Sequence, residues 1–197
     1  MKQAYVNGEP ISKEAVQFEF DRLVKFYATH GIGPDEIKKN LEKLMEKAQE
    51  QAIGAKLLLA RAEQLDMPVD EKAIDAQLNE VIRQVGGRDN FVKALARQKI
   101  GEDDFRKTLA RGCRVDALVQ KACSGVPEPT EEDVAAYYEA HRASFVVPPQ
   151  SDDESPVQQS LVDVADSIRD LLRHEARGRA TEAFVAELRE KANVEYR

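Results

Sequence analysis

The sequence predicts an all-α fold with a minor β-sheet that joins the N- and C-termini. Apolar residues recur at spacings of three and four over most of the 197 residues, as they do on one face of a helix. The few glycines and prolines stand at the edges of these periodic segments. Two short strand-like segments, Ala4 to Val6 and Val194 to Tyr196, lie at opposite ends of the chain and have no other evident partner, so we expect them to pair.

The first elements are marked by turn and capping residues. The dipeptide Asn7-Gly8 favours a tight hairpin turn directly after the first strand-like segment. Ser12 is a good N-cap for a helix that extends to about Thr29. Pro34 suits the first position of a helix, and the apolar spacing then continues to Leu65. We therefore expect one long helix from Pro34 to Leu65.

Three further helices follow in the middle of the chain. Asp70 is the expected cap of the first, which Gly86-Gly87 stops. A short helix begins at Asp89. Another opens at Glu102 with acidic residues, which are favourable at a helix N-terminus, and continues to about Cys123.

The last third of the chain contains one short and one very long helical segment. Thr130 and Asp133 have the spacing of a capping box, and the helix after them is expected to end at "VVPP". The longest periodic signal covers about 162 to 191. A helix of that length needs a partner for its apolar face, so we expect it to pack against the helix that starts at Pro34.

Composition narrows the possible functions. Hydrophobic residues make up 42% of the chain and charged residues 33%, which is typical of a globular protein. The net charge of −7 argues against nucleic acid as a partner, because phosphate binding needs a basic stripe. No apolar stretch approaches the length of a membrane span, which argues against membrane insertion. Four arginines near the end are interleaved with acids and predict a solvated helix face: Arg169, Arg173, Arg177 and Arg179.

The residues that commonly carry chemistry are scattered. Cys113 and Cys123 lie on one expected helix, about 15 Å apart, which is too far for a disulfide, so we expect two free thiols. The three histidines, His30, His141 and His174, have no partners at metal-ligand spacing. The sequence thus predicts no catalytic residue, no metal and no cofactor.

The order of several motifs is more specific than any one of them. A strand-turn "AYVNGEPIS" is followed by "LLLARAEQLDMPVDEKAIDAQLNEV", "FVKALARQKIGEDDFRKTL" and "VPEPTEEDVAAYYEAHRASFVVP". From about Val6 to Pro148 this resembles the N-terminal chaperone region of the SurA and PrsA foldases, which are parvulin-type peptidyl-prolyl isomerases. The tail "VADSIRDLLRHEARGRATEAFVAELREKANVEYR" looks like the C-terminal helix and strand of the same family.

The resemblance implies a domain organisation. Residues 1–197 are expected to form a single helical chaperone-like domain, made of an N-terminal part, 1–147, and a C-terminal helix and strand, 157–197. The short loop 148–156 stands where the family carries a parvulin domain of roughly a hundred residues, and it is too short to hold that fold. Family resemblance places such a protein in the periplasm or another extracytoplasmic compartment. The absence of a signal peptide favours the cytoplasm if the sequence is complete.

The resemblance favours ATP-independent binding of unfolded or extended polypeptides, without isomerase activity in this chain. Two alternatives stay open: the core of a peptidyl-prolyl isomerase whose catalytic domain is absent from this chain, and a helical interaction module that forms homodimers by exchange of its C-terminal helix. The candidate peptide-binding residues are apolar and aromatic, and for each of them core packing is the commoner role: Phe20, Phe26, Tyr27, Met45, Tyr137, Tyr138 and Phe145.

Overall fold

The computed structural model of the chain describes residues 2–147 and 156–197. These residues form two compact units. The first contains the chain up to Lys121 together with Phe184–Arg197, and the second contains Ala122–Ala183. Helix α8 (Leu161–Glu190) contributes to both units. The loop predicted at 148–156 lies outside the described residues except for its last position, and the single-domain organisation stays a prediction.

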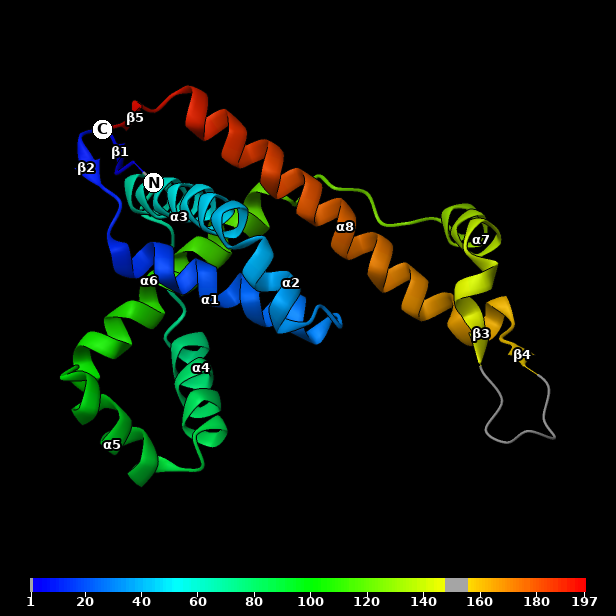
Figure 1. The fold of residues 1–197 in the computed structure, drawn as a ribbon, viewed down its shortest axis with the longest axis horizontal. Helices are drawn as coiled ribbons and strands as arrows, with labels where there is room; N and C mark the ends of the chain where they lie inside the picture. Colours follow the sequence, from blue (N-terminus) through cyan, green and yellow to red (C-terminus); the bar gives the residue numbers. More distant parts are fainter. Residues whose placement is uncertain (1, 148–155) are drawn as a thin grey trace. The chain divides into compact units, whose positions relative to one another are not determined.

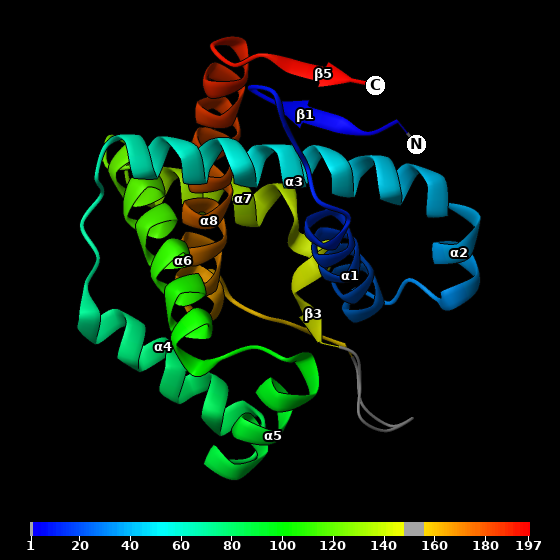
Figure 2. The same cartoon turned by 90° about the vertical axis from the view of Figure 1, so that its left-hand side faces the viewer.

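The sheet of the first unit joins the two termini, as predicted. Strand β1 (Ala4–Val6) lies between β2 (Glu9–Pro10) and β5 (Val194–Tyr196), and both pairings are antiparallel. Val6 is opposite Val194 in the register. In Figures 1 and 2, the blue and red ends of the chain run side by side. The last strand of the chain therefore completes a sheet that the first residues begin.

The turn between β1 and β2 explains why Asn7 and Gly8 occupy it. Both residues have positive φ angles, 52° and 84°. This is the backbone of a two-residue hairpin turn that matches the twist of the strands, and glycine and asparagine adopt it at least cost.

We expect glycine-to-alanine changes at two positions to have opposite effects on stability. Gly8→Ala should destabilise the protein by about 1 kcal/mol, since alanine is strained at a φ of 84°. Gly112→Ala should stabilise it by about 0.5–1 kcal/mol, because Gly112 lies inside helix α6 and an added Cβ meets no other atom within 4 Å. Urea unfolding of both variants measures the two shifts, and shifts of the same sign would contradict this account of the turn.

Helices α1 (Lys13–Thr29) and α3 (Leu41–Gln64) form the centre of the first unit (Figure 2). Ser12 caps α1, as predicted, by accepting a hydrogen bond from the backbone N–H of Ala15 at 3.1 Å. The apolar stripe of α1 packs against α3 and β1. This core consists of Ala4, Val6, Ile11, Val16, Leu23, Ala48, Ala52, Ile53 and Leu57.

The prediction of one helix from Pro34 to Leu65 is wrong. The segment contains two helices, α2 (Pro34–Lys39) and α3, with Asn40 between them at φ −104° and ψ 15°. The side-chain Nδ2 of Asn40 donates to the backbone carbonyl of Glu36 and to its carboxylate. Asparagine competes in this way for backbone groups that a continuous helix would use.

The C-terminal end of α8 packs against α3, as predicted for the long last helix. Leu188 contacts the core of the first unit. Gly54 permits a close approach, since a Cβ there would lie 3.3 Å from Cγ1 of Val185.

A polar cluster also joins α8, α3 and β5. Arg189 forms an ion pair with Glu50, and the Tyr196 hydroxyl donates to the same carboxylate at 2.6 Å. Burial alone would raise the pKa of Glu50, but the hydrogen bonds from Arg189 and Tyr196 outweigh it and lower that pKa. The cluster therefore holds the last strand against the central helix.

Helices α4 (Glu71–Gln84), α5 (Arg88–Gln98) and α6 (Glu102–Ala122) complete the first unit. Asp70 caps α4 through the backbone N–H of Lys72, and α4 ends before the two glycines, as predicted. The C-terminal part of α6 packs against the C-terminal end of α3 in a smaller cluster around Ala62, Met67 and Leu118.

The second unit has its own small core. Helix α7 (Glu131–Ala140) begins with the predicted capping box of Thr130 and Asp133. The prediction that this helix reaches "VVPP" is wrong: α7 ends at Ala140, and a 3₁₀ turn, Arg142–Phe145, follows. The His141 N–H is shared between two carbonyls of α7, which tightens the last turn.

Two short strands form a small sheet after that turn. Strand β3 (Val146–Val147) pairs antiparallel with β4 (Val157–Gln158), with Val147 opposite Val157. Val147 and Val157, which lie on either side of the residues that the structure does not describe, are therefore neighbours in space. The unit's core comprises Val134, Tyr138, Val164 and Ile168, with Tyr137, Phe145, Leu161, Ala165 and Leu172 packed around them.

Candidate functional site

The seven predicted peptide-binding residues lie in different surroundings. In the first unit, Phe20, Tyr27 and Met45 are partly buried against the core, whereas Phe26 is 54% exposed. The residues of the second unit, Tyr137, Tyr138 and Phe145, all pack in its small core. The Tyr138 hydroxyl donates to the Gln159 carbonyl at 2.5 Å. Phe26 is therefore the only one of the seven whose side chain is mostly accessible, and a role in binding stays a prediction for the other six.

Phe18 was not among the predicted residues, yet 62% of it is exposed. Phe18, Arg22 and Phe26 are four residues apart and share one side of α1, which we call the α1 face. The positions 16, 20, 23 and 27 form the opposite stripe, which packs inward. A helical wheel that separated these two stripes would have identified Phe18 from the sequence.

A groove runs beside the α1 face, between α1 and α3. Its volume is 530 Å³, and among the described residues that line it none is acidic. The lining residues are Arg22, Leu23, Lys25, Phe26, Thr29, Lys47 and Gln51. The ring of Phe26 packs edge-on against Tyr27, with centroids 5.5 Å apart, and beside the His30 ring at 4.1 Å. The groove thus offers a fixed aromatic surface bordered by cations.

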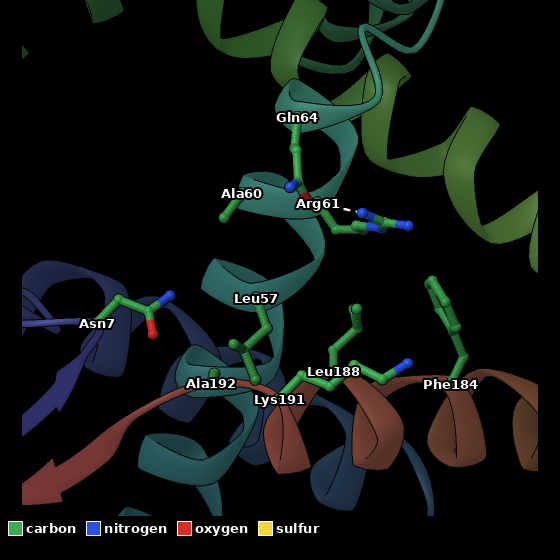
Figure 3. Close-up of a pocket in the computed structure, with 9 residues that line it drawn as sticks. All are labelled: Asn7, Leu57, Ala60, Arg61, Gln64, Phe184, Leu188, Lys191 and Ala192. Atoms are coloured by element: carbon green, nitrogen blue, oxygen red, sulfur yellow. Dashed lines mark hydrogen bonds between the residues drawn. The ribbon is translucent and has the colours of Figure 1, made fainter.

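A second pocket lies between α3, the end of α8 and the β1–β2 turn, and Figure 3 shows its lining side chains. We call it the α3/α8 pocket; its volume is 390 Å³. Apolar side chains from both helices form much of its surface, and two cationic and two amide side chains complete it. The residues are Asn7, Leu57, Ala60, Arg61, Gln64, Phe184, Leu188, Lys191 and Ala192.

The groups that commonly support catalysis are dispersed over the part of the chain that the structure describes. Cys113 and Cys123 are both buried and free, as predicted. Burial, with Asp116 and Asp70 nearby, raises the pKa of the Cys113 thiol, which disfavours a reactive thiolate. Residues 2–147 and 156–197 contain no group of three or more His, Cys, Asp or Glu side chains placed to hold a metal ion.

The four arginines of the basic cluster near the end of the chain have acidic neighbours. Arg173 pairs with Glu128 and Asp170, and the other three arginines of the cluster also have acidic partners. The predicted solvated face holds for Arg177 and Arg179, whereas Arg169 and Arg173 are partly buried. None of the helices in the described ranges combines the length and apolar character needed to cross a bilayer.

A solved structure from Campylobacter jejuni has a similar fold. It comes from work describing the virulence factor PEB4 and the periplasmic protein Cj1289 as two structurally related SurA-like chaperones. The superposition covers 100% of this chain and 98% of that one, with a TM-score of 0.52 and 14% sequence identity. At that identity the likeness concerns the fold alone. No curated protein sequence matches the chain significantly.

The family comparison rests on the sequence itself. Residues 2–119 match the family described as SurA-like N-terminal domain. The match covers more than half of the chain and includes the hairpin, α1 and the central helix α3. The predicted all-α fold with a minor sheet between the termini is seen in the structure, and the match agrees with its helical part. The chain therefore belongs to the family of SurA-like N-terminal domains.

Proposed function

We propose that this chain binds unfolded or extended polypeptides without ATP, as a chaperone does, and that the α1 face is a contact surface. The observation that carries the proposal is the exposure of two phenylalanines, 62% at Phe18 and 54% at Phe26, on one side of a single helix. Phe26 lines the groove between α1 and α3, and Phe18 lies on the same side of α1, outside that lining. Large exposed aromatic groups are typical of protein-binding surfaces. Membership of a SurA-like family supports the same function.

The size of the face predicts weak binding. Covering a large apolar side chain contributes about 1.5–3 kcal/mol, so two phenylalanines contribute a few kcal/mol together. A flexible client loses conformational freedom when it is held, which offsets part of this gain. Such binding suits a protein that must release its client without nucleotide hydrolysis.

The charges around the groove favour one kind of segment. Lys25 and Lys47 line it without a carboxylate within 4.0 Å among the described residues, whereas Arg22 pairs with Glu19 at 2.8 Å. We therefore expect apolar segments with interspersed acids to bind better than basic ones. Because the apolar contact dominates, binding should persist at moderate salt, where exposed charges are screened beyond about 10 Å.

The decisive variant removes the aromatic face and leaves the helix intact. Phe18→Ser/Phe26→Ser should lose at least half of the wild-type suppression of aggregation when a chemically unfolded client is diluted into buffer and light scattering is followed. Serine and phenylalanine have similar helix propensities, so α1 should persist. The matched control is Val92→Ser/Val162→Ser, which removes two side chains that are 49% and 86% exposed on other helices.

Two outcomes would decide against the proposal. Wild-type protein that suppresses no more scattering than an equal mass of an inert acidic protein would exclude chaperone-like binding. Equal loss in the double variant and its control would exclude the α1 face. The same preparation should give no rate enhancement on a proline-containing peptide. The isomerase alternative, whose catalytic domain is absent from this chain, is discriminated by the sequence of the parent gene between Pro148 and Pro156. A concentration series in light scattering discriminates the homodimer alternative.

A further inference from the structure

We propose that the α3/α8 pocket binds the C-terminal carboxylate of a polypeptide whose last side chain is apolar. This site is separate from the α1 face, and the inference does not depend on binding there. All nine lining residues belong to the first unit, so the pocket is formed by elements that pack on one another.

The pocket surface has two chemically different parts. Leu57 and Ala60 on α3 lie opposite Leu188 on α8 and form an apolar surface, which Phe184 borders in Figure 3. Arg61 and Lys191 bring two cations to the same pocket from opposite helices. A volume of 390 Å³ is at the lower end of the range for small-ligand pockets and suits a single residue.

The two cations lack the partners that most arginines of this protein have. Among the described residues, neither Arg61 nor Lys191 has a carboxylate within 4.0 Å, whereas Arg106 pairs with both Glu71 and Asp75. The guanidinium of Arg61 donates instead to the neutral Oε1 of Gln64, at 2.7 Å. No acidic residue is found among the described residues that line the pocket. An anionic ligand would therefore supply the missing charge.

The combination selects a peptide C-terminus. Its last residue carries a carboxylate and a side chain on the same Cα, so an apolar side chain can contact Leu57 and Leu188 while the carboxylate meets the cations. Phosphate has no apolar group. An internal aspartate or glutamate has a carboxylate but no additional apolar side chain on the same residue. The amides of Asn7 and Gln64 also line the pocket; the Oδ1 of Asn7 already accepts the Asn193 N–H, so its Nδ2 stays available as a donor to a peptide carbonyl.

Fluorescence anisotropy with an N-terminally labelled hexapeptide, Ser-Gly-Ser-Gly-Ser-Leu, tests the proposal. The peptide with a free C-terminal carboxylate should bind at least about tenfold more tightly than the same peptide with a C-terminal amide, because charge-assisted hydrogen bonds are lost in the amide. Octanoate has a carboxylate and an apolar tail but no peptide groups, and it should compete only at much higher concentration. Equal affinity for acid and amide, or competition by octanoate at peptide concentrations, would overturn the proposal.

Variants of the pocket locate the binding. Arg61→Gln/Lys191→Gln should lower the affinity for the free-acid peptide about tenfold, to the level of the amide. Lys93→Gln/Arg97→Gln removes the same charge from α5 and should leave the affinity unchanged. If the two double variants weaken binding equally, the effect is one of net charge and the assignment of the pocket is wrong.

A second pair of variants tests the apolar part without altering charge. Ala60→Phe places a ring in the pocket and should abolish binding of the free-acid peptide. Ala55→Phe introduces the same ring at an exposed α3 position that does not line the pocket, and it should bind as the wild type does. Thermal unfolding of both confirms that they fold. Phe18→Ser/Phe26→Ser should bind the free-acid peptide as tightly as the wild type does. A wrong assignment of the α1 face and a wrong assignment of the α3/α8 pocket can therefore be distinguished.

Discussion

A chain that ends at Pro156 is expected to lose the cooperative unfolding transition of the 197-residue protein. The deletion removes Leu188 and Val194 from the packing around the first core and strips Val164 and Ile168 from the second. The buried Val164 and Ile168 contribute about 3–6 kcal/mol at roughly 1.5–3 kcal/mol each, and the partly buried Leu188 and Val194 add to this. That is comparable to the whole stability of a typical domain, which is about 5–15 kcal/mol.

Circular dichroism during thermal unfolding measures the loss of cooperativity. The control adds the deleted segment back as a separate chain. Residues 157–197 supplied as a separate chain should restore a cooperative transition, because β5 and α8 re-form the same contacts with β1, α3 and α7. A truncated chain that melts with the midpoint and steepness of the full chain would show that the last helix and strand do not complete either unit.

Ile168→Ala is expected to destabilise the second unit by about 2–5 kcal/mol. Only 1% of Ile168 is exposed, and it packs with Val134, Tyr138 and Val164 in a core of few residues. The alanine leaves a cavity that so small a core can fill only by moving its helices. Leu171→Ala, three residues further along the same helix at 39% exposure, should cost less than about 1 kcal/mol.

Hydrogen exchange resolves where the Ile168 variant is weakened. Amides of α7 and of the neighbouring part of α8 should exchange faster, while those of α1 and α3 should keep wild-type protection, since they belong to the other unit. Equal destabilisation by both alanine variants would mean that burial at position 168 does not determine the stability of this unit.

Local signals in the sequence predicted most of the helices and turns. Capping groups act within a few residues, so Ser12, Asp70 and the Thr130–Asp133 pair could be assigned from spacing alone. The Asn7-Gly8 turn followed in the same way. The pairing of β1 with β5 was predicted on other grounds, because neither strand-like end of the chain had another evident partner. The break at Asn40 was missed because the apolar spacing continues across it. The Asn40 side chain donates to the Glu36 carbonyl, which also accepts the Asn40 backbone N–H.

The candidate sites were harder to predict because they depend on which face of each helix is covered. Composition does not distinguish Phe18 from Phe20, yet the first is exposed and the second packs against the core. The α3/α8 pocket unites residues as distant in sequence as Asn7 and Lys191, so no local pattern indicates it. Arg61 becomes notable only when the packing shows that no acid in the described residues lies beside it.

Site-specific photo-crosslinking measures most directly whether the α1 face holds unfolded polypeptide. A benzophenone side chain is introduced at position 18, 26 or 92 in separate proteins, and each is irradiated with a permanently unfolded client. Val92 is the control, because it is 49% exposed and belongs to a different helix, α5. Crosslinking from positions 18 and 26 should be several-fold stronger than from position 92, and unlabelled client should compete it away. Equal yields from all three positions, or yields that competitor does not reduce, would contradict binding at the α1 face.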